Sequence, residues 1–281
     1  MGNFHKSVLL KETITGLKVE KNKKYIDATL GGGGHSFEIL RLGGTVLGID
    51  VDKDAIAYIG KSKPENLTVA RGNFRDIDKI ALLNNFDKVA GIIFDLGVSS
   101  HQIDEPTRGF SFQNEGPLDM RMDQELGVRA LDLIRILTKE EFNEIFTKFG
   151  EESHAWAISN AIVRARSVKP IETTADLAKI VFKIAGQSKR VFQALRIAVN
   201  DELNAITEAL PKALKLLERN GRLCVISFHS LEDRIVKKQF LEFEEKKLGR
   251  IITEKPIVPT KAEIGRNKRA RSAKLRIFKK N

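Results

Sequence analysis

Two acidic residues and a glycine-rich segment near the N-terminus have the spacing of a nucleoside-binding site. The segment Asp27-x-Thr29-x-Gly31-x-Gly33 follows a short apolar run, and Asp50 ends the next one. Glycines after a first parallel strand let the backbone turn tightly beside a ligand, and an acid roughly twenty residues on can accept hydrogen bonds from a ribose diol. The spacing therefore predicts a nucleoside ligand, with a purely structural glycine turn as the alternative.

Other residues favour S-adenosylmethionine over a dinucleotide. The dinucleotide pattern Gly-x-Gly-x-x-Gly needs a third glycine where this chain has Ser36. Neither Tyr25 nor Tyr58 begins a Tyr-x-x-x-Lys pair. Phe74 could set its ring beside an adenine or belong to the core. Asp95 ends an apolar run where a doubly wound sheet opens its ligand crevice, and a carboxylate there would attract the sulfonium or amino group of the donor.

Short apolar runs that alternate with helical stretches are the elements that would position these residues. A helix is expected from Ser36 to Arg41 and another over 54–58. The expected strands are 25–29, 45–50, 67–70, 89–95, 222–227 and two weaker candidates, 251–254 and 274–279. Strands separated by helices of this length indicate a mostly parallel sheet with helices on both faces.

Between the fourth and fifth expected strands the apolar spacing becomes helical. Residues 108–123 form a loop rich in glycine, proline and charge, and helical spacing then continues from 128 to a C-cap at Asn220-Gly221. We predict a Rossmann-like α/β domain with a mixed, mostly parallel sheet, interrupted by an all-α insertion. The sheet domain would comprise residues 1–104 and 216–281, and the insertion, with a role in substrate recognition, residues 105–215.

The composition is strongly basic. The chain of 281 residues has a net charge of +11 and a sequence pI of about 9.6, which fits either a polyanionic partner or a lysine-rich proteome. The excess is densest near the end, where Glu263 is the only acid among these cations: Lys261, Arg266, Lys268, Arg269, Arg271, Lys274, Arg276, Lys279 and Lys280.

Other features of the composition point to the cytoplasm. Cys224 is the only cysteine, so no disulfide framework is expected. No apolar run approaches the ~20 residues that span a bilayer, and residues 1–6 carry no signal-peptide apolar region. We expect a cytoplasmic protein without a membrane partner, either a monomer or a homodimer.

Long motifs throughout the chain carry a family resemblance. They are Val8-Leu9-Leu10-Lys11-Glu12, Gly33-Gly34-His35-Ser36, Asp95-Leu96-Gly97-Val98-Ser99-Ser100, Arg108-Gly109-Phe110-Ser111-Phe112, Leu118-Asp119-Met120-Arg121-Met122-Asp123, Phe192-Gln193-Ala194-Leu195-Arg196-Ile197, Ser227-Phe228-His229-Ser230-Leu231-Glu232-Asp233-Arg234 and Arg269-Ala270-Arg271-Ser272-Ala273-Lys274-Leu275-Arg276. With these motifs the sequence resembles the bacterial 16S rRNA (cytosine-1402-N4) methyltransferases. It departs from them at 187–191, where the family has His-Pro-Ala-Thr-Arg, and at Lys268, where the family has proline.

The resemblance implies a seven-stranded methyltransferase domain with a helical insertion. It implies that the enzyme methylates the exocyclic N4 amine of a cytosine in the decoding region of 16S rRNA, with the small ribosomal subunit as partner. It also implies contacts to S-adenosylmethionine from these residues: Gly33, Gly34, His35, Asp50, Phe74, Asp95 and Gln102.

A cytosine amine is a poor nucleophile because its lone pair is delocalised into the ring. An enzyme can accept its N–H hydrogens and hold the nitrogen in line with the methyl–sulfur bond. Many amino-methyltransferases use an Asn/Asp-Pro-Pro-aromatic turn after the fourth strand, whereas this chain has the proline-free 95–100 segment. We expect backbone carbonyls of this turn, or the Asp95 carboxylate as a catalytic group, to accept the amine hydrogens.

Several other charged residues have two interpretations. In the 108–123 loop, Arg121 could grip RNA or close over the donor, but mutual pairing with Asp119 or Asp123 is favoured. His229 and Asp233 could face the target base, although a structural role for the histidine is favoured. The five histidines show no ligand spacing, so we predict no bound metal, apart from Mg²⁺ carried loosely with the RNA.

Three rival functions are weighed against this prediction. An NAD-dependent oxidoreductase would need the missing third glycine and the Tyr/Lys pair. A non-catalytic RNA-binding or assembly protein could keep a relic donor pocket, although the intact Gly33–Ser36 and Asp95–Ser100 motifs argue against decay. Methylation of DNA or of a small molecule is the nearest enzymatic alternative, and only the family resemblance opposes it.

Overall fold

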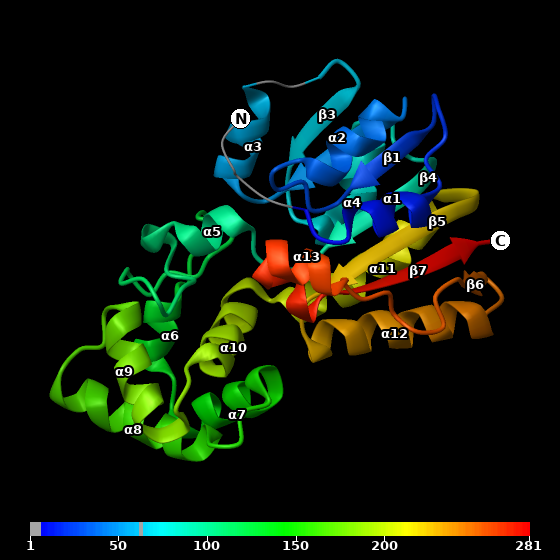
Figure 1. The fold of residues 1–281 in the computed structure, drawn as a ribbon. Coiled ribbons are helices and arrows are strands. Elements are labelled where there is room, and N and C mark those ends of the chain that lie inside the picture. Colours follow the sequence, from blue (N-terminus) through cyan, green and yellow to red (C-terminus); the bar gives the residue numbers. More distant parts are fainter. Residues whose placement is uncertain (1–6, 62–63) are drawn as a thin grey trace. The chain divides into compact units, whose positions relative to one another are not determined.

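The computed structural model describes residues 7–61 and 64–281, which fold into two compact units (Figure 1). The sheet unit comprises Met1–Ser99 and Leu203–Asn281, and the helical unit comprises Ser100–Glu202. The predicted boundaries, 104/105 and 215/216, are therefore displaced at both ends. The larger displacement arises because α11 (Glu202–Leu216) packs Ile206, Ala209 and Leu210 into the core beneath the sheet.

The sheet has seven strands in the order β3-β2-β1-β4-β5-β7-β6. The strands are β1 (Lys24–Asp27), β2 (Thr45–Asp50), β3 (Leu67–Arg71), β4 (Val89–Asp95), β5 (Leu217–Ser227), β6 (Gly249–Ile251) and β7 (Lys274–Lys280). The first five are parallel, whereas β7 pairs antiparallel with β5, and β6 antiparallel with β7. The predicted class, a Rossmann-like mixed sheet with an all-α insertion, is confirmed.

Helices cover both faces of this sheet, so its central strands are apolar on both sides. Their bounds are α1 (Leu10–Leu17), α2 (Gly34–Arg41), α3 (Lys53–Gly60), α4 (Ile77–Leu83), α12 (Ser230–Glu245) and α13 (Lys261–Arg266), with short 3₁₀ turns η1 (Phe74–Asp76) and η3 (Lys268–Ser272). One core joins Phe94 and Val225 with α4, α11 and α12. The other joins Tyr25, Ile93 and Cys224 with α1, α2 and α3. Each strand alternates its side chains between the two cores.

The helical unit has a core of its own. Its elements are α5 (Ser100–Asp104), η2 (Pro106–Arg108), α6 (Ala130–Ile136), α7 (Lys139–Gly150), α8 (Ala155–Val168), α9 (Thr174–Ala185) and α10 (Lys189–Asn200). Thr138 and Thr173 begin α7 and α9 with capping boxes, in which each hydroxyl accepts a backbone N–H of the first turn. Phe142, Phe146 and Leu195 are among its buried residues.

The end of α11 differs from the prediction. The helix ends at Leu216, so the predicted C-cap at Asn220-Gly221 is wrong. Asn220 does have a φ of +67°, but it lies in β5, in an irregularity between the pairs Val89–Leu217 and Gly91–Arg222. In the described part of the chain, none of the helices has the length and apolar character needed to cross a membrane.

Candidate active site

Three acidic residues end three neighbouring strands on the same edge of the sheet. Asp27 is the last residue of β1, Asp50 of β2 and Asp95 of β4. Because these strands are parallel and adjacent, their carboxyl ends open onto one crevice, which is where doubly wound sheets bind ligands. The structure therefore brings the predicted acids to one place.

The loop after β1 has a backbone that requires glycine. Gly33 has a φ of +76° and forms the N-cap of α2. A Cβ there would lie 2.8 Å from Ile59 Cδ1 and 2.9 Å from Phe37 Cε2, so neither the conformation nor the space admits a side chain. A Cβ on Gly34 would collide with Ser7. The two glycines thus let the loop pack closely against its neighbours where α2 begins, and the first N–H groups of α2 follow directly.

Asp50 is held by the backbone on both of its oxygens. Oδ2 accepts the Gly31 N–H at 2.7 Å, and Oδ1 accepts the Asp52 N–H at 2.9 Å. Burial nevertheless raises the pKa of Asp50 to about 6. Each carboxylate oxygen keeps a second lone pair, so Asp50 can still accept hydrogen bonds from two ligand hydroxyls.

Asp27 and Asp95 flank His35. Asp27 Oδ2 accepts the Ser36 hydroxyl hydrogen at 2.7 Å, and burial raises the pKa of this acid. His35 Nδ1 lies 3.8 Å from Asp95 Oδ2. His35 Nε2 is buried and has no hydrogen-bond partner among residues 7–61 and 64–281, so it is suited to a polar ligand atom. The backbone N–H of Asp95 donates to Thr29 Oγ1 at 2.6 Å, which fixes β4 against the loop.

The sequence predicted that Ser36 begins a helix and noted that it is not glycine. The structure instead begins α2 at Gly34, with Gly33 as the N-cap, and the hydroxyl of Ser36 donates to Asp27. The bond joins the end of β1 to the first turn of α2. A short-range signal did exist, because Asp27 and Ser36 belong to two motifs that overlap at Gly33. The spacing alone did not show that Ser36 points at the acid.

Phe74 packs against the core, as one of its two interpretations expected, and its place beside an adenine stays a prediction. Its ring meets Phe94 edge to face, with the centroids 5.6 Å apart, and packs partly buried against the core. Asn73 caps the turn by accepting the Arg75 N–H, so Phe74 is held in place beyond the end of β3. Six of the seven predicted donor contacts lie in the sheet unit, whereas Gln102 lies buried on α5 of the helical unit.

The loop of the helical unit contains the pairing that the sequence favoured. Arg121 donates to both oxygens of Asp119, with Nε and Nη2 each at 2.8 Å. These bonds hold the pKa of Asp119 below its usual range. Buried Arg108 donates through Nη2 to the backbone carbonyls of Arg121 and Met122. The hydrogen bonds of these side chains lie within the loop and stabilise its conformation.

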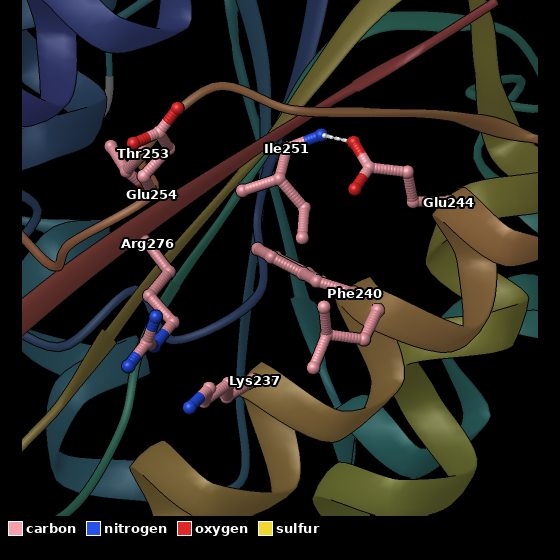
Figure 2. Close-up of a pocket in the computed structure, with 8 residues that line it drawn as sticks. Lys237, Phe240, Glu244, Ile251, Thr253, Glu254 and Arg276 are labelled. Carbon is pink, nitrogen blue, oxygen red and sulfur yellow. Dashed lines mark hydrogen bonds between the residues drawn. The ribbon is translucent and has the colours of Figure 1, made fainter.

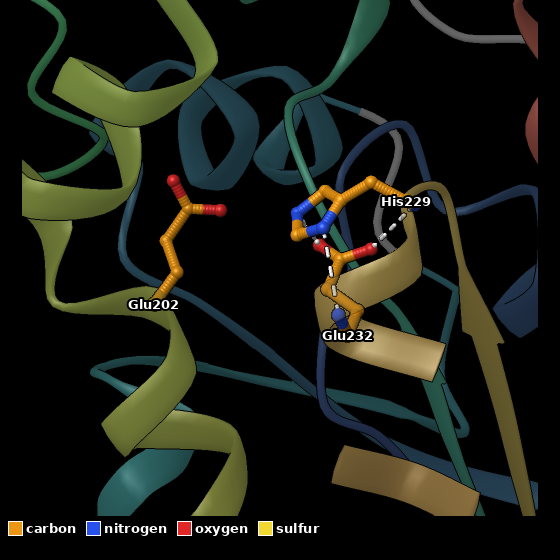
Figure 3. Close-up of side chains that lie close together, drawn as sticks. All are labelled: Glu202, His229 and Glu232. Atoms are coloured by element: carbon orange, nitrogen blue, oxygen red, sulfur yellow. Dashed lines mark hydrogen bonds and ion pairs between the residues drawn. The ribbon is translucent and has the colours of Figure 1, made fainter. Parts of the chain in front are cut away.

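His229 and Asp233 also have structural partners. Figure 3 shows the His229 ring beside the carboxylate of Glu232, with Nε2 3.1 Å from Oε1. Glu232 Oε2 accepts the Phe228 N–H at 2.7 Å, which completes the start of α12. Glu232, which the sequence did not single out, is fully buried. The third residue drawn, Glu202, belongs to the helical unit and accepts two hydrogen bonds from Arg196 there.

Asp233 forms an ion pair that stabilises the antiparallel side of the sheet. Arg276 on β7 donates to both oxygens of Asp233, at 2.7 and 3.2 Å, and Lys274 donates at 3.1 Å. These partners hold the pKa of Asp233 below its usual range. A separate cavity of about 280 Å³ lies between α12, β6 and β7 (Figure 2). Two of its charged groups are engaged in the fold, because Arg276 binds Asp233 and Glu244 accepts the Ile251 N–H. The strand-end crevice, beside which the predicted donor residues of the sheet unit lie, is the stronger candidate.

Comparison with known proteins gives consistent matches over the whole chain. A family model described as the MraW methylase family matches residues 2–281. The chain is similar to proteins named ribosomal RNA small subunit methyltransferase H. The one from Halothermothrix orenii is 44% identical, covering 97% of each chain, and the one from Thermomicrobium roseum is 45% identical, covering 98% of this chain and 93% of the relative.

A third such relative, from Carboxydothermus hydrogenoformans, is 43% identical over 98% of this chain and 97% of its own length. Among solved structures, an rRNA methylase from Streptococcus thermophilus is similar over 98% of this chain and 97% of that one, with 12% identity and a TM-score of 0.47. The sequence matches extend over both the sheet unit and the helical unit.

Proposed function

The chain belongs to the MraW methylase family, and we propose that it methylates the N4 amine of a cytosine, position 1402, in the decoding region of 16S rRNA. It is a methyltransferase that uses S-adenosylmethionine. The relatives that match its whole length carry the name of ribosomal RNA small subunit methyltransferases, which supports the substrate class. Such an enzyme would act in the cytoplasm, on small ribosomal subunits.

The observation that carries the donor site is the set of strand-end acids beside the glycine loop, with Asp27 buried and Asp50 and Asp95 half-buried. In the described part of the chain, neither Asp27 nor Asp50 forms an ion pair with a lysine or arginine. A cationic ligand would compensate their charge. Bound S-adenosylmethionine supplies an electrophilic methyl group on a positively charged sulfur. The residues present fit that group.

We assign the donor contacts within the sheet unit as follows. Asp50 accepts the ribose hydroxyls, and Phe74 lies beside the adenine. Gly33 and Gly34 lie at the start of α2, where the first backbone N–H groups of the helix would be offered to the ligand. His35 offers its unpartnered Nε2. Asp95 contributes negative charge to the place where the sulfur is bound.

Asp95 or the turn after it would also prepare the target amine. Accepting the amine hydrogens favours a more pyramidal nitrogen, whose lone pair is then available for in-line attack. Gly97 in this turn has a φ of +93°, and a Cβ there would come no closer than 3.7 Å to Phe228. The turn therefore depends on glycine for its conformation.

The helical unit is proposed to recognise the RNA around the target. Arg166 donates to the Ile134 carbonyl, so it is partly structural. Arg164 is exposed on α8. Trp156 is 52% exposed, with Lys139 Nζ 4.1 Å from its ring centroid. Exposed rings beside cations stack on unpaired bases.

Methyl transfer from radiolabelled S-adenosylmethionine tests the proposal. Small ribosomal subunits lacking the modification would be compared with free 16S rRNA and with DNA, and the labelled nucleoside identified by chromatography. We expect label in N4-methylcytidine at position 1402 of the subunit rRNA. Label in a different nucleoside, or only in DNA, would overturn the assigned substrate, and absence of label despite measurable donor binding would favour the assembly-protein alternative.

A further inference from the structure

The segment from Lys261 to Ser272 presents an unusual group of exposed cations. We call it the basic edge and define it by the exposed residues of α13 and η3: Lys261, Arg266, Lys268, Arg269 and Arg271. The single acid of this segment, Glu263, is committed elsewhere, because its Oε1 accepts the Leu9 N–H at 2.7 Å.

Four of the five cations of the basic edge have no acidic partner in the described part of the protein. Lys261, Arg266, Lys268 and Arg271 form no ion pair with any residue in 7–61 or 64–281. Like charges held close together repel one another, which opposes the folded conformation. An anionic partner would remove that repulsion.

Buried alanines and capping hydrogen bonds hold the backbone of the basic edge in place. Ala270 and Ala273 are buried in the core on the α1, α2 and α3 face of the sheet. Asn267 caps η3 by accepting the Arg269 N–H, and Thr260 caps α13 by accepting the Glu263 N–H. The backbone is thus fixed while the cationic side chains project outward.

The basic edge lies at the same end of the sheet as the candidate active site. Lys274, the first residue of β7, pairs with Ser227 at the end of β5, and Ile226 pairs with Asp95. The segment immediately before Lys274 therefore lies beyond the carboxyl ends of β4 and β5. Figure 1 shows α13 in orange beyond the arrowhead of β5.

We propose that the basic edge binds the phosphates of the RNA strand that carries the target base. The inference rests on the proposed function and adds the surface that grips the substrate. A base inside an A-form helix does not reach a donor crevice, so the target must be unstacked and its backbone held. Arginine and lysine neutralise phosphates, and each contact releases a counterion. The basic edge stands where the backbone of an unstacked nucleotide must pass.

A salt titration of RNA binding tests this assignment. The double variant Lys268→Gln/Arg271→Gln would be compared with the control Lys237→Gln/Lys238→Gln, whose exposed lysines lie on α12, on the opposite face of the sheet. The probe is a labelled RNA fragment of the decoding region, and binding of S-adenosylmethionine is measured in parallel.

For two lost phosphate contacts, the slope of log K against log salt should become shallower by about 1.4. KM for the small subunit should rise about tenfold or more with kcat nearly unchanged, and donor affinity should not change. Lys268→Arg should preserve the slope. An unchanged slope in the basic-edge variant, or an equal change in the α12 control, would overturn the inference. If the unaltered enzyme fails to methylate the subunit, the proposed function fails instead, and the two failures are thereby distinguished.

Discussion

The strand ends of the sheet unit and the loop of the helical unit both bury acids, but they treat them in opposite ways. Asp119 in the loop is held by two charged hydrogen bonds from Arg121, and its pKa is lowered. Asp27 and Asp50 at the strand ends have only neutral hydrogen-bond donors, and burial raises their pKa values. An acid satisfied by its own chain stabilises the fold, whereas an acid left short of positive charge is available to a ligand.

The difference also has an energetic sense. Burying a carboxylate without a cation opposes folding, and backbone N–H groups offset only part of that cost. The two N–H donors to Asp50 come from the loops after β1 and β2, so the ligand site and its supporting backbone form together. Substitutions in the two regions should therefore separate function from stability.

The largest effect is expected from Asp95→Ala. If Asp95 serves the donor or the target amine, methyl transfer should fall by about a hundredfold to a thousandfold, the range seen when a preorganised electrostatic group is removed. Single-turnover methylation of small subunits measures it. Asp119→Ala is the contrasting variant and should retain methylation near the unaltered level at temperatures where it stays folded. Near-normal methyl transfer by Asp95→Ala would contradict the catalytic role assigned to Asp95.

A smaller effect is expected for donor binding in Asp50→Ala. The loss of charged hydrogen bonds to two hydroxyls, about 1.5–3 kcal/mol, corresponds to roughly 10- to 100-fold weaker binding. Isothermal titration with S-adenosylmethionine gives the affinity, and S-adenosylhomocysteine, which has the same ribose without the positive sulfur, should lose a similar factor. If the affinities of the two ligands fell by very different factors, Asp50 would interact with the sulfur charge and not with the ribose.

Stability should respond in the other region. Arg121→Ala leaves half-buried Asp119 without its cation, and we expect a loss of about 2 kcal/mol in the free energy of unfolding of the helical unit. Trp156 is the only tryptophan of the chain and lies on α8, so its fluorescence during denaturant unfolding reports on this unit. Lys148→Ala breaks an exposed pair with Glu144 and should change stability by less than about 0.5 kcal/mol. Equal losses in the two variants would contradict the structural role of the Arg121 pair.

The sequence predicted the positions of the strand-end acids well because continuous apolar runs are a strong local signal. The expected strands 45–50 and 89–95 agree with β2 and β4 at both ends. Helices α1, α4 and α12 were not predicted. In α12, for example, many charged residues interrupt the apolar positions. The helix is stabilised by Val236 and Phe240, which pack against residues that are distant in the sequence.

The partners of the site residues were harder to predict than their positions. The Asp27–Ser36 bond depends on how the α2 N-terminus turns above β1, and the Glu232 contacts depend on the capping geometry at His229. The spacing of residues in the sequence predicts the element on which they lie, but it does not predict the direction of their side chains. The Asp119–Arg121 pair was predicted because only one residue separates its members in the sequence.

The smallest predicted effect has opposite signs for binding and for stability. With a pKa of about 6, Asp50 gains a proton as pH falls from 7 to 5.5, and a protonated acid no longer accepts two hydroxyl hydrogens. Donor affinity should therefore fall by about fourfold over this interval.

The stability of the unliganded protein should instead rise as pH falls, because the folded state binds this proton more tightly than the unfolded chain. The stability contributed by Asp50 is full at low pH and is lost as pH rises through about 6. The unaltered protein is compared with Asp50→Asn at each pH. Titration gives the contribution of Asp50 to donor affinity, and thermal melting gives its contribution to stability. Parallel pH trends in affinity and stability would show that Asp50 is a structural acid like Asp119 and would remove the contrast between the two regions.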